Sequence, residues 1–449
     1  MPPDSSDAAA TAPARGYSAL FRTREFTPLF VAAAFQAMAS TVAGLALGTL
    51  VYRATESPLL SALSMFGPSL VQMVGAATLL SAADRLPPRA TIAGIASVFG
   101  VGTAFLALPG LPVWAVFAVI LGLGLVNSLG GGVRWGLLNE ILSKDGYLLG
   151  RSVFNMLSGV AQVTGFAAGG VLVALLSPRV TLLSAAALYL AGAAAVRLGL
   201  SRRAPRVSGR PSIAQTWRTN ARLWAYAPRR NVYLLLWIPN GLIVGCESLF
   251  VSYAPDRAGL LFASAAFGMF VGDVTAGRFL PPALRPRLGG PFLVLLAGPY
   301  LLFFLHPGAG AAAACAAVAS VGFGASLIQQ ERLMSLTPDE LSGHALGLHS
   351  SGMLTMQGVS AALAGTLAQL TSAGTAMTLM AAASLTVTAA VSAADRGRRR
   401  NAQREGTAGS GAADAIAADV TAADVTAAGG SSGGSGSGGS ARRPPADRS

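Results

Sequence analysis

Long apolar runs separated by short polar links dominate the chain between residues 29 and 394. A helix that crosses about 30 Å of hydrocarbon needs roughly 20 apolar residues, and twelve runs are close to or above that length. They cover residues 29–52, 59–82, 90–111, 113–138, 153–176, 180–200, 232–253, 258–279, 288–305, 309–328, 346–370 and 373–394. Because lipid offers unpaired backbone groups no partner, each run must be helical. The pattern predicts an all-α polytopic membrane protein with twelve transmembrane helices.

The longest polar link lies between the sixth and seventh runs, and it divides the chain into two halves of six helices each. The expected segments are a polar N-terminal segment at 1–25, a six-helix bundle at 26–200, an Arg-rich linker at 201–230, a second six-helix bundle at 231–395 and a tail at 396–449. The tail contains a run of only Gly and Ser at 429–440 and cannot bury apolar area, so we expect it to be disordered.

The linker contains a helical pattern of its own. Ile213, Trp217, Ala221 and Trp224 fall on one side of a helix, and several arginines fall off it. This pattern predicts a short amphipathic helix on the inner membrane surface. A solvated, charged linker is the alternative.

The two halves also resemble each other at one point. Gly150 to Gly159 leads into the fifth run, and Gly343 to Gly352 leads into the eleventh, with two Gly and one Ser at matching offsets. Duplicated halves are common in transporters. We therefore expect two six-helix bundles related by a pseudo-twofold repeat.

Composition narrows the class of protein further. Hydrophobic residues make up 53% of the chain and charged residues 11%, whereas ordinary soluble domains carry about 25% charged residues. A soluble enzyme or a nucleic-acid-binding protein is therefore excluded.

The net charge of +13 reflects arginines in the alternate links, which predicts that both termini and the linker are cytoplasmic. Abundant Arg, Ala and Gly, with Lys144 the single lysine, are typical of a GC-rich bacterial genome, so we expect a bacterial cell membrane. Residues 1–24 lack the apolar stretch of a signal peptide.

Two local motifs indicate a family. The link after the second run reads Leu80-Ser-Ala-Ala-Asp-Arg-Leu-Pro-Pro-Arg, and the fifth run contains Gly165-Phe-Ala-Ala-Gly-Gly170. Together with the 6+6 pattern, they resemble the major facilitator superfamily, and within it the bacterial drug and macrolide efflux branch of drug–proton antiporters. Both glycines and one arginine of the first motif are missing, and Phe166 replaces the proline of the second.

The resemblance assigns roles to both motifs. It implies an inner gate formed by Asp84, Arg85 and Arg89, with Glu140 as a possible partner, although the arginines also suit simple anchoring at the membrane surface. It also implies a sliding contact at Gly165, Gly169 and Gly170, for which ordinary helix packing is the alternative.

Ionisable and polar residues within the apolar runs mark candidate pathways, because charge at the bilayer centre costs at least about 2.5–3.5 kcal/mol. The candidates for the proton or substrate pathway are Glu247, Arg134, Asp273, His349, Asn127, Gln36 and Asn240. Glu247 is the preferred proton carrier, since a carboxyl in a low-dielectric pathway holds a proton readily; a position facing water at the outer surface is the alternative. Arg134 fits an anionic substrate group or a carboxylate partner, or it extends to the headgroups. His349 suits either titration near neutral pH or a structural role.

These patterns predict a secondary transporter, namely proton-coupled efflux of a small amphipathic drug or metabolite by a monomer in the bilayer, with the proton as coupling ion. An importer or uniporter with the same fold and a non-transporting interaction protein stay open. We find no phosphate-binding loop, no metal-ligand spacing, no cofactor motif and no catalytic constellation, and we expect no nucleic-acid partner.

Overall fold

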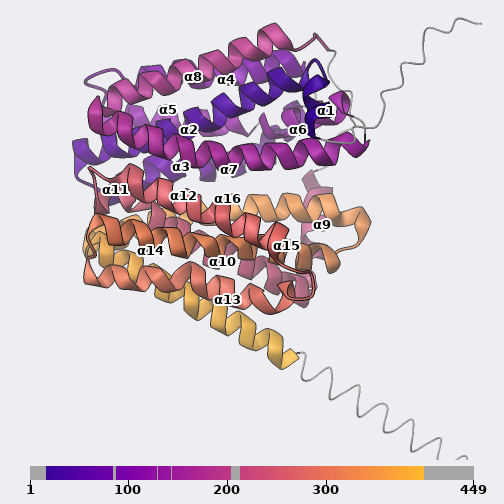
Figure 1. Ribbon diagram of the computed structural model, residues 1–449, viewed down its shortest axis with the longest axis vertical. Coiled ribbons are helices and arrows are strands. Elements are labelled where there is room, and N and C mark those ends of the chain that lie inside the picture. The colour runs from indigo at the N-terminus through magenta and orange to yellow at the C-terminus, as the bar shows by residue number, and fades with distance from the viewer. Residues whose placement is uncertain (1–16, 84–86, 129, 143, 204–212, 399–449) are drawn as a thin grey trace, which may run out of the picture. The chain divides into compact units, whose positions relative to one another are not determined.

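The chain is all-helical in the computed structural model, which describes residues 17–83, 87–128, 130–142, 144–203 and 213–398. Nine helices among these residues are long and apolar enough to cross a membrane. Three further crossings are made by α3 (Pro58–Ala83), by α16 (Ser342–Leu370) and by the pair α5 (Val113–Asn127) and α6 (Gly130–Ile141). The predicted fold class of twelve transmembrane helices is confirmed (Figure 1).

The first bundle follows a short helix, α1 (Tyr17–Arg22). It contains α2 (Phe26–Thr55), α3, α4 (Pro88–Leu106), α5, α6, α7 (Lys144–Leu175) and α8 (Pro178–Gly199). Three of these helices begin at a proline, Pro58, Pro88 and Pro178, where the missing N–H costs nothing. The side chain of Ser177 caps α8 by accepting a hydrogen bond from the Val180 amide at 3.2 Å. Within the bundle, α2 packs against α7 and α8, and α3 packs against α5.

The second bundle follows the linker helix α9 (Ile213–Ala225). It contains α10 (Ala227–Ser248), α11 (Phe250–Tyr253), α12 (Ala258–Val274), α13 (Arg285–Ala297), α14 (Ala309–Val321), α15 (Ala325–Ser335), α16 and the helix Ala373–Arg398. Several crossings change helix type part-way. A π-helical turn at Thr275–Phe279 extends α12, and 3₁₀ segments extend α13 at Gly298–Leu305 and join α14 to α15 at Gly322–Gly324. Within the bundle, α10 packs against α16 and α12 against α14.

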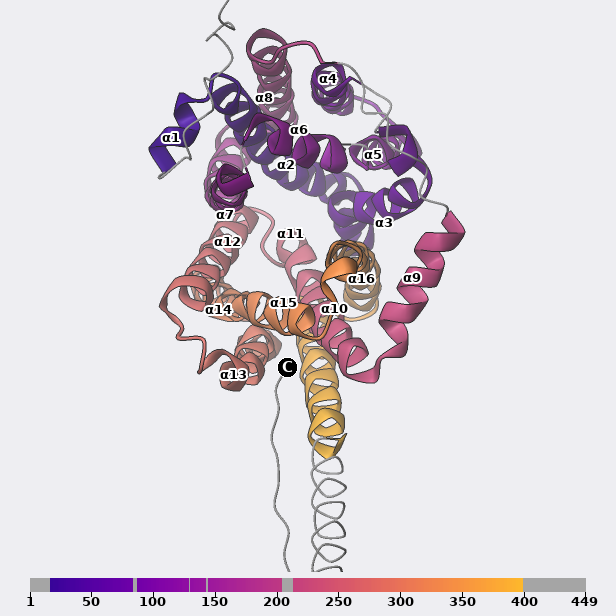
Figure 2. The ribbon, with the colours of Figure 1, turned by 90° about the vertical axis from the view of Figure 1, so that its right-hand side faces the viewer.

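Basic residues gather at one end of the helices, which we call the basic end. The links and helix ends there carry Arg24, Arg89, Arg151, Arg203, Arg230, Arg278, Arg285 and Arg332. The other end, which we call the opposite end, carries Arg53, Arg179 and Arg257. Figure 2 looks onto the basic end, with α1, α6, α9 and α15 toward the viewer.

Two helix pairs join the bundles, α3 with α16 and α7 with α12. Their closest contacts lie between the middle of the helices and the opposite end. A methyl group added at Gly170 would lie 2.7 Å from the Cα of Gly259, and one added at Gly365 would lie 2.6 Å from the Cα of Leu59. At the basic end, α6 and α15 have their substantial contacts within their own bundles. The bundles are therefore joined mainly away from the basic end.

Candidate functional site

Arg134 projects from α6 toward α2 in the first bundle. One guanidinium nitrogen, Nη2, donates a hydrogen bond of 2.9 Å to Oε1 of Gln36. Both residues are half-buried. None of the acidic side chains in the described part of the chain forms an ion pair with Arg134. The structure thus brings two of the predicted pathway residues together and leaves the guanidinium without a counter-charge among the described residues.

Glu247 lies one residue before the end of α10 and is 8% exposed. Its carboxylate accepts a hydrogen bond of 3.4 Å from the Ser320 hydroxyl on α14. The hydroxyl of Tyr300, also buried, has no hydrogen-bond partner in the described structure. The carboxyl therefore points into the second bundle, which argues against the alternative of a surface residue that simply faces water.

A second polar group lies nearer the basic end of the second bundle. Nδ2 of Asn240 donates to the Leu236 carbonyl at 2.6 Å and to the Ser326 hydroxyl at 3.2 Å. The Asn240 Oδ1, the Gln329 Oε1 and the His349 Nδ1 are buried without a partner in the described chain. Buried polar atoms of this kind cost about 1–3 kcal/mol each when unsatisfied. Each of these atoms is therefore a candidate for a hydrogen bond with a bound polar group.

The other two pathway candidates lie apart from these groups. Asn127 ends α5 and is half-buried. Asp273 lies on α12 one residue before its end and is exposed, whereas Glu247 on α10 is buried. The structure shows no contact of either residue with Arg134, Glu247 or Asn240.

The predicted inner gate is described only in part. Asp84 and Arg85 lie outside the described residues. Arg89, at the start of α4, donates from Nη2 to the Arg197 carbonyl near the end of α8. Glu140, at the end of α6, forms an ion pair of 3.4 Å with Arg203. Arg203 also contacts the Glu25 carboxylate at 2.6 Å, so one arginine ties the start of α2 to the end of α6.

Glu25 was not predicted from the sequence. Partial burial raises the pKa of Glu25, but hydrogen bonds from Ser201 and the charges of Arg203 and Arg24 outweigh it, and the net pKa lies below the ordinary value. The amide of Ser201 donates to Glu25 Oε1 at 3.0 Å. Arg203 lies beyond α8, 178 residues along the chain from Glu25, which is why spacing alone gave no signal.

The glycines of the α7 motif serve two different contacts. Added methyl groups would lie 2.9 Å from the Thr41 Cβ at Gly165 and 3.3 Å from the Val42 Cα at Gly169, so both positions face α2 of the same bundle. Gly170 faces Gly259 of the other bundle. Phe166, which replaces the proline of the motif that this segment resembles, stacks on Phe262 with ring centroids 4.7 Å apart. The departure from the motif thus creates an aromatic contact between the bundles.

An aromatic stack joins the linker helix to the second bundle. Trp224 of α9 stacks on Trp237 of α10 with a centroid distance of 5.5 Å, and Tyr233 stacks on Trp237 at 5.0 Å. Leu223 is fully buried, whereas Trp217 is 71% exposed. The face of α9 that docks therefore includes Leu223, which the sequence pattern had not placed on it. Tyr233 and Trp237 lie one helical turn apart, so the sequence could have indicated the contact between these two rings. It gave no signal for the contact between Trp224 and Trp237.

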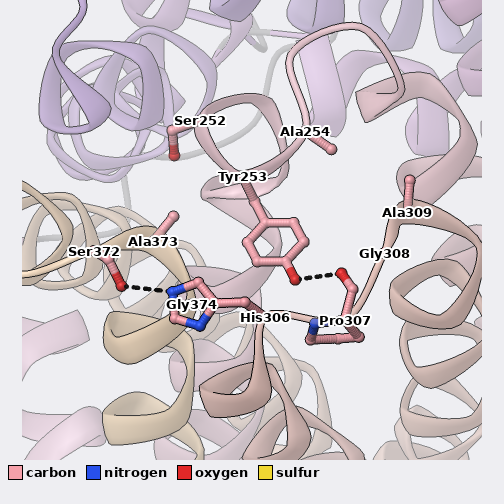
Figure 3. Close-up of a pocket in the computed structure, with 10 residues that line it drawn as sticks. All are labelled: Ser252, Tyr253, Ala254, His306, Pro307, Gly308, Ala309, Ser372, Ala373 and Gly374. Atoms are coloured by element: carbon pink, nitrogen blue, oxygen red, sulfur yellow. Dashed lines mark hydrogen bonds between the residues drawn. The ribbon is translucent and has the colours of Figure 1, made fainter.

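A pocket of about 410 Å³ opens at the opposite end of the second bundle (Figure 3). Its polar lining comes from Ser252, Tyr253, His306 and Ser372. The Tyr253 hydroxyl donates to the Pro307 carbonyl at 2.7 Å, and the Ser372 hydroxyl lies 3.4 Å from His306 Nε2. The first bond joins the end of α11 to the link before α14, and the second joins that link to the one after α16.

Comparison with solved structures identifies the architecture. The nucleoside transporter NupG matches with a TM-score of 0.65 and 12% identity over 82% of this chain and 98% of that one. A POT family transporter in complex with a thioalcohol-conjugated peptide matches with a TM-score of 0.66 and 12% identity over 83% and 96%. The chain has the fold of these transporters.

A third match is a bacterial homologue of the human lysosomal transporter Spinster, in an inward-facing and unoccupied conformation. Its TM-score is 0.60, with 14% identity over 83% of this chain and 94% of that one. No family model matches the sequence, and no curated protein matches it. At these identities the likeness establishes the twelve-helix fold and not a substrate.

Proposed function

We propose that the protein is a secondary active transporter that moves its cargo by alternating access. Two bundles that meet mainly along two helix pairs, α3 with α16 and α7 with α12, can rock about a site between them. The solved structures of this fold are of transporters for small molecules such as nucleosides and peptides. These observations support a small-molecule cargo carried by a single chain.

The direction of opening follows from the distribution of charge and contacts. By the positive-inside rule the basic end is cytoplasmic, which gives both termini and the α9 linker a cytoplasmic location. The closest contacts between the bundles among the described residues lie from the middle to the opposite end, as at Gly170 with Gly259. We infer that this arrangement is the one closed toward the outside, with the cytoplasmic side as the side that opens.

Proton-coupled efflux of a small amphipathic compound is the activity that we infer for this fold. The observation that carries it is Glu247, a carboxyl 8% exposed inside the second bundle with one long hydrogen bond from Ser320. A carboxylate buried with so few donors is unstable as an anion, whereas its protonated form is tolerated. Alternate exposure of this group to the two sides of the membrane would carry one proton inward per cycle.

Proton flux in everted membrane vesicles tests the proposal. A pH-sensitive dye would report proton movement when a macrolide, an aromatic cation or an aromatic carboxylate is added to energised vesicles. We expect proton release with at least one compound, lost in Glu247→Gln and retained in Glu331→Gln. Glu331 is the matched control because its side chain is 55% exposed and pairs with Arg285. Coupling that persists in Glu247→Gln, with normal protein levels, would remove this residue from the mechanism.

The same vesicles separate the rival functions. An importer would accumulate its compound in right-side-out vesicles without releasing protons from everted ones. A non-transporting interaction protein would show neither flux, and deletion of residues 405–449, which lie outside the described residues, would abolish its activity. A transporter is expected to tolerate that deletion.

A further inference from the structure

Arg134 places a fixed positive charge on α6, within the fourth crossing of the first bundle. A charge inside a crossing is costly and usually pairs with an opposite charge or with hydrogen-bond partners. The Arg134 side chain reaches α2, where Gln36 accepts its hydrogen bond at 2.9 Å.

The acidic side chains that the structure describes at the basic end of the first bundle are engaged elsewhere. Glu25 and Glu140, which lie at the basic end of the same bundle, both pair with Arg203. Glu247 lies in the other bundle near the opposite end, where Ser320 donates to it. The described part of the protein therefore gives Arg134 a neutral partner and no anion.

The pair of Arg134 and Gln36 presents mainly hydrogen-bond donors. A guanidinium has five N–H groups in a planar fork, and one nitrogen is used on Gln36. The Gln36 Oε1 accepts this bond and keeps one lone pair, and the amide nitrogen of Gln36 adds two N–H groups. Carboxylate and phosphate oxygens accept such donors in a bidentate manner, whereas an ammonium group would be repelled and a neutral amide would leave the charge uncompensated.

We propose that Arg134 and Gln36 bind an anionic group of the cargo, so that the cargo is an amphipathic organic anion bearing a carboxylate or a phosphate. The site lies in the basic half of the first bundle, where α6 makes its substantial contacts within its own bundle. A net charge of +13, concentrated at that end, attracts anions toward it. This inference rests on the proposed transport function and specifies its cargo.

Binding of four matched probes tests the inference without any proton gradient. The probes are 4-phenylbutyrate, 4-phenylbutyl phosphate, 4-phenylbutanamide and 4-phenylbutylamine, titrated into the purified full chain in lipid nanodiscs by calorimetry. We expect the two anions to bind at least tenfold more tightly than the amide and the amine. In Arg134→Gln, the preference of carboxylate over amide should fall to about one, while Arg134→Lys should keep part of it because charge remains but the fork is lost.

Two controls keep the result specific. Gln36→Glu, which places a carboxylate against Arg134, should abolish the preference for anions. Arg151→Gln removes an exposed arginine of the basic end whose guanidinium lies over Trp135, and it should leave the preference unchanged. Glu247→Gln should also bind the anions as the wild type does, so a failure of proton coupling is distinguishable from a failure of this inference. The inference is overturned if neither anion binds, if the amide binds as tightly as the carboxylate, or if a folded Arg134→Gln keeps the preference.

Discussion

The contact between Gly170 of α7 and Gly259 of α12 gives the most direct test of how the bundles meet. In Gly170→Ala the new Cβ would lie 2.7 Å from the Gly259 Cα, a backbone atom that no side-chain rotation can move. Carbon atoms in contact normally lie about 3.5–4.0 Å apart. The two helices must therefore separate locally by about 1 Å.

Inserting a methyl group into a packed contact of this kind costs about 1–3 kcal/mol. The cost falls on the arrangement in which the bundles touch at the opposite end, because an arrangement open at that end does not contain the contact. A bias of that size changes the ratio of two conformations by roughly 5- to 150-fold. We expect Gly170→Ala to populate the arrangement that is open at the opposite end.

Distances between spin labels at Leu176→Cys and Leu260→Cys would measure the change, with Cys246 and Cys315 replaced by alanine. Leu176 and Leu260 are 58% and 47% exposed. Leu176 directly follows the end of α7, and Leu260 lies on α12 beside the contact. The control is Gly94→Ala on α4, where an added methyl group meets nothing within 4 Å. Both substitutions raise helix propensity equally. Identical distance distributions in the two variants would refute the proposed role of this contact.

Three further predictions concern the basic end and are measured on purified protein. The pKa of Glu25 lies below its ordinary value of 4.5. Its ion pair therefore stabilises the fold fully above about pH 4.5, and this stabilisation is lost as the pH falls through the lowered pKa. The melting temperatures of wild type and Glu25→Gln should differ at neutral pH and converge in acid. Arg229 is 7% exposed and donates to the carbonyls of Leu336 and Leu223, so Arg229→Met should cost about 1–3 kcal/mol, and an unchanged melting temperature would contradict this. Trp224→Ala should release α9 and raise trypsin cleavage at Arg222 several-fold, whereas Trp217→Ala, at an exposed position, should leave cleavage unchanged.

The fold was predictable because each crossing is a local run of apolar residues in the sequence. A run of apolar residues needs no distant partner to be helical in lipid, and prolines such as Pro58 and Pro178 begin helices where the runs begin. The interruptions were not predictable. The fourth crossing is two helices, one ending at Asn127 and the next beginning at Gly130, and 3₁₀ segments enter the ninth and tenth crossings. At the tenth crossing the interruption coincides with a tertiary contact, because Gly322 lies against the backbone of Leu296.

The sequence predicted which residues are candidates for the site, but not which of them contact each other. Sequence reasoning selected Arg134 and Gln36 separately, but they are 98 residues apart and no spacing rule connects them. Ser320, which donates to Glu247, lies 73 residues away and carried no signal. In the sequence, Phe166 is only a departure from the proline of the motif. The structure shows that its ring stacks on Phe262. The roles of all these residues in transport stay predictions.

The docking of α9 on the second bundle limits how far the two bundles can move apart. Arg203 is fastened to Glu25 and Glu140 of the first bundle, and Trp224 is stacked on Trp237 of the second. Ten peptide units join Arg203 to Ile213 along the chain. A chain of that length spans at most about 35 Å when fully extended. The distance between these two attachment points therefore cannot exceed that length, and removing residues between them would lower the upper limit on how far the basic ends of the bundles can separate.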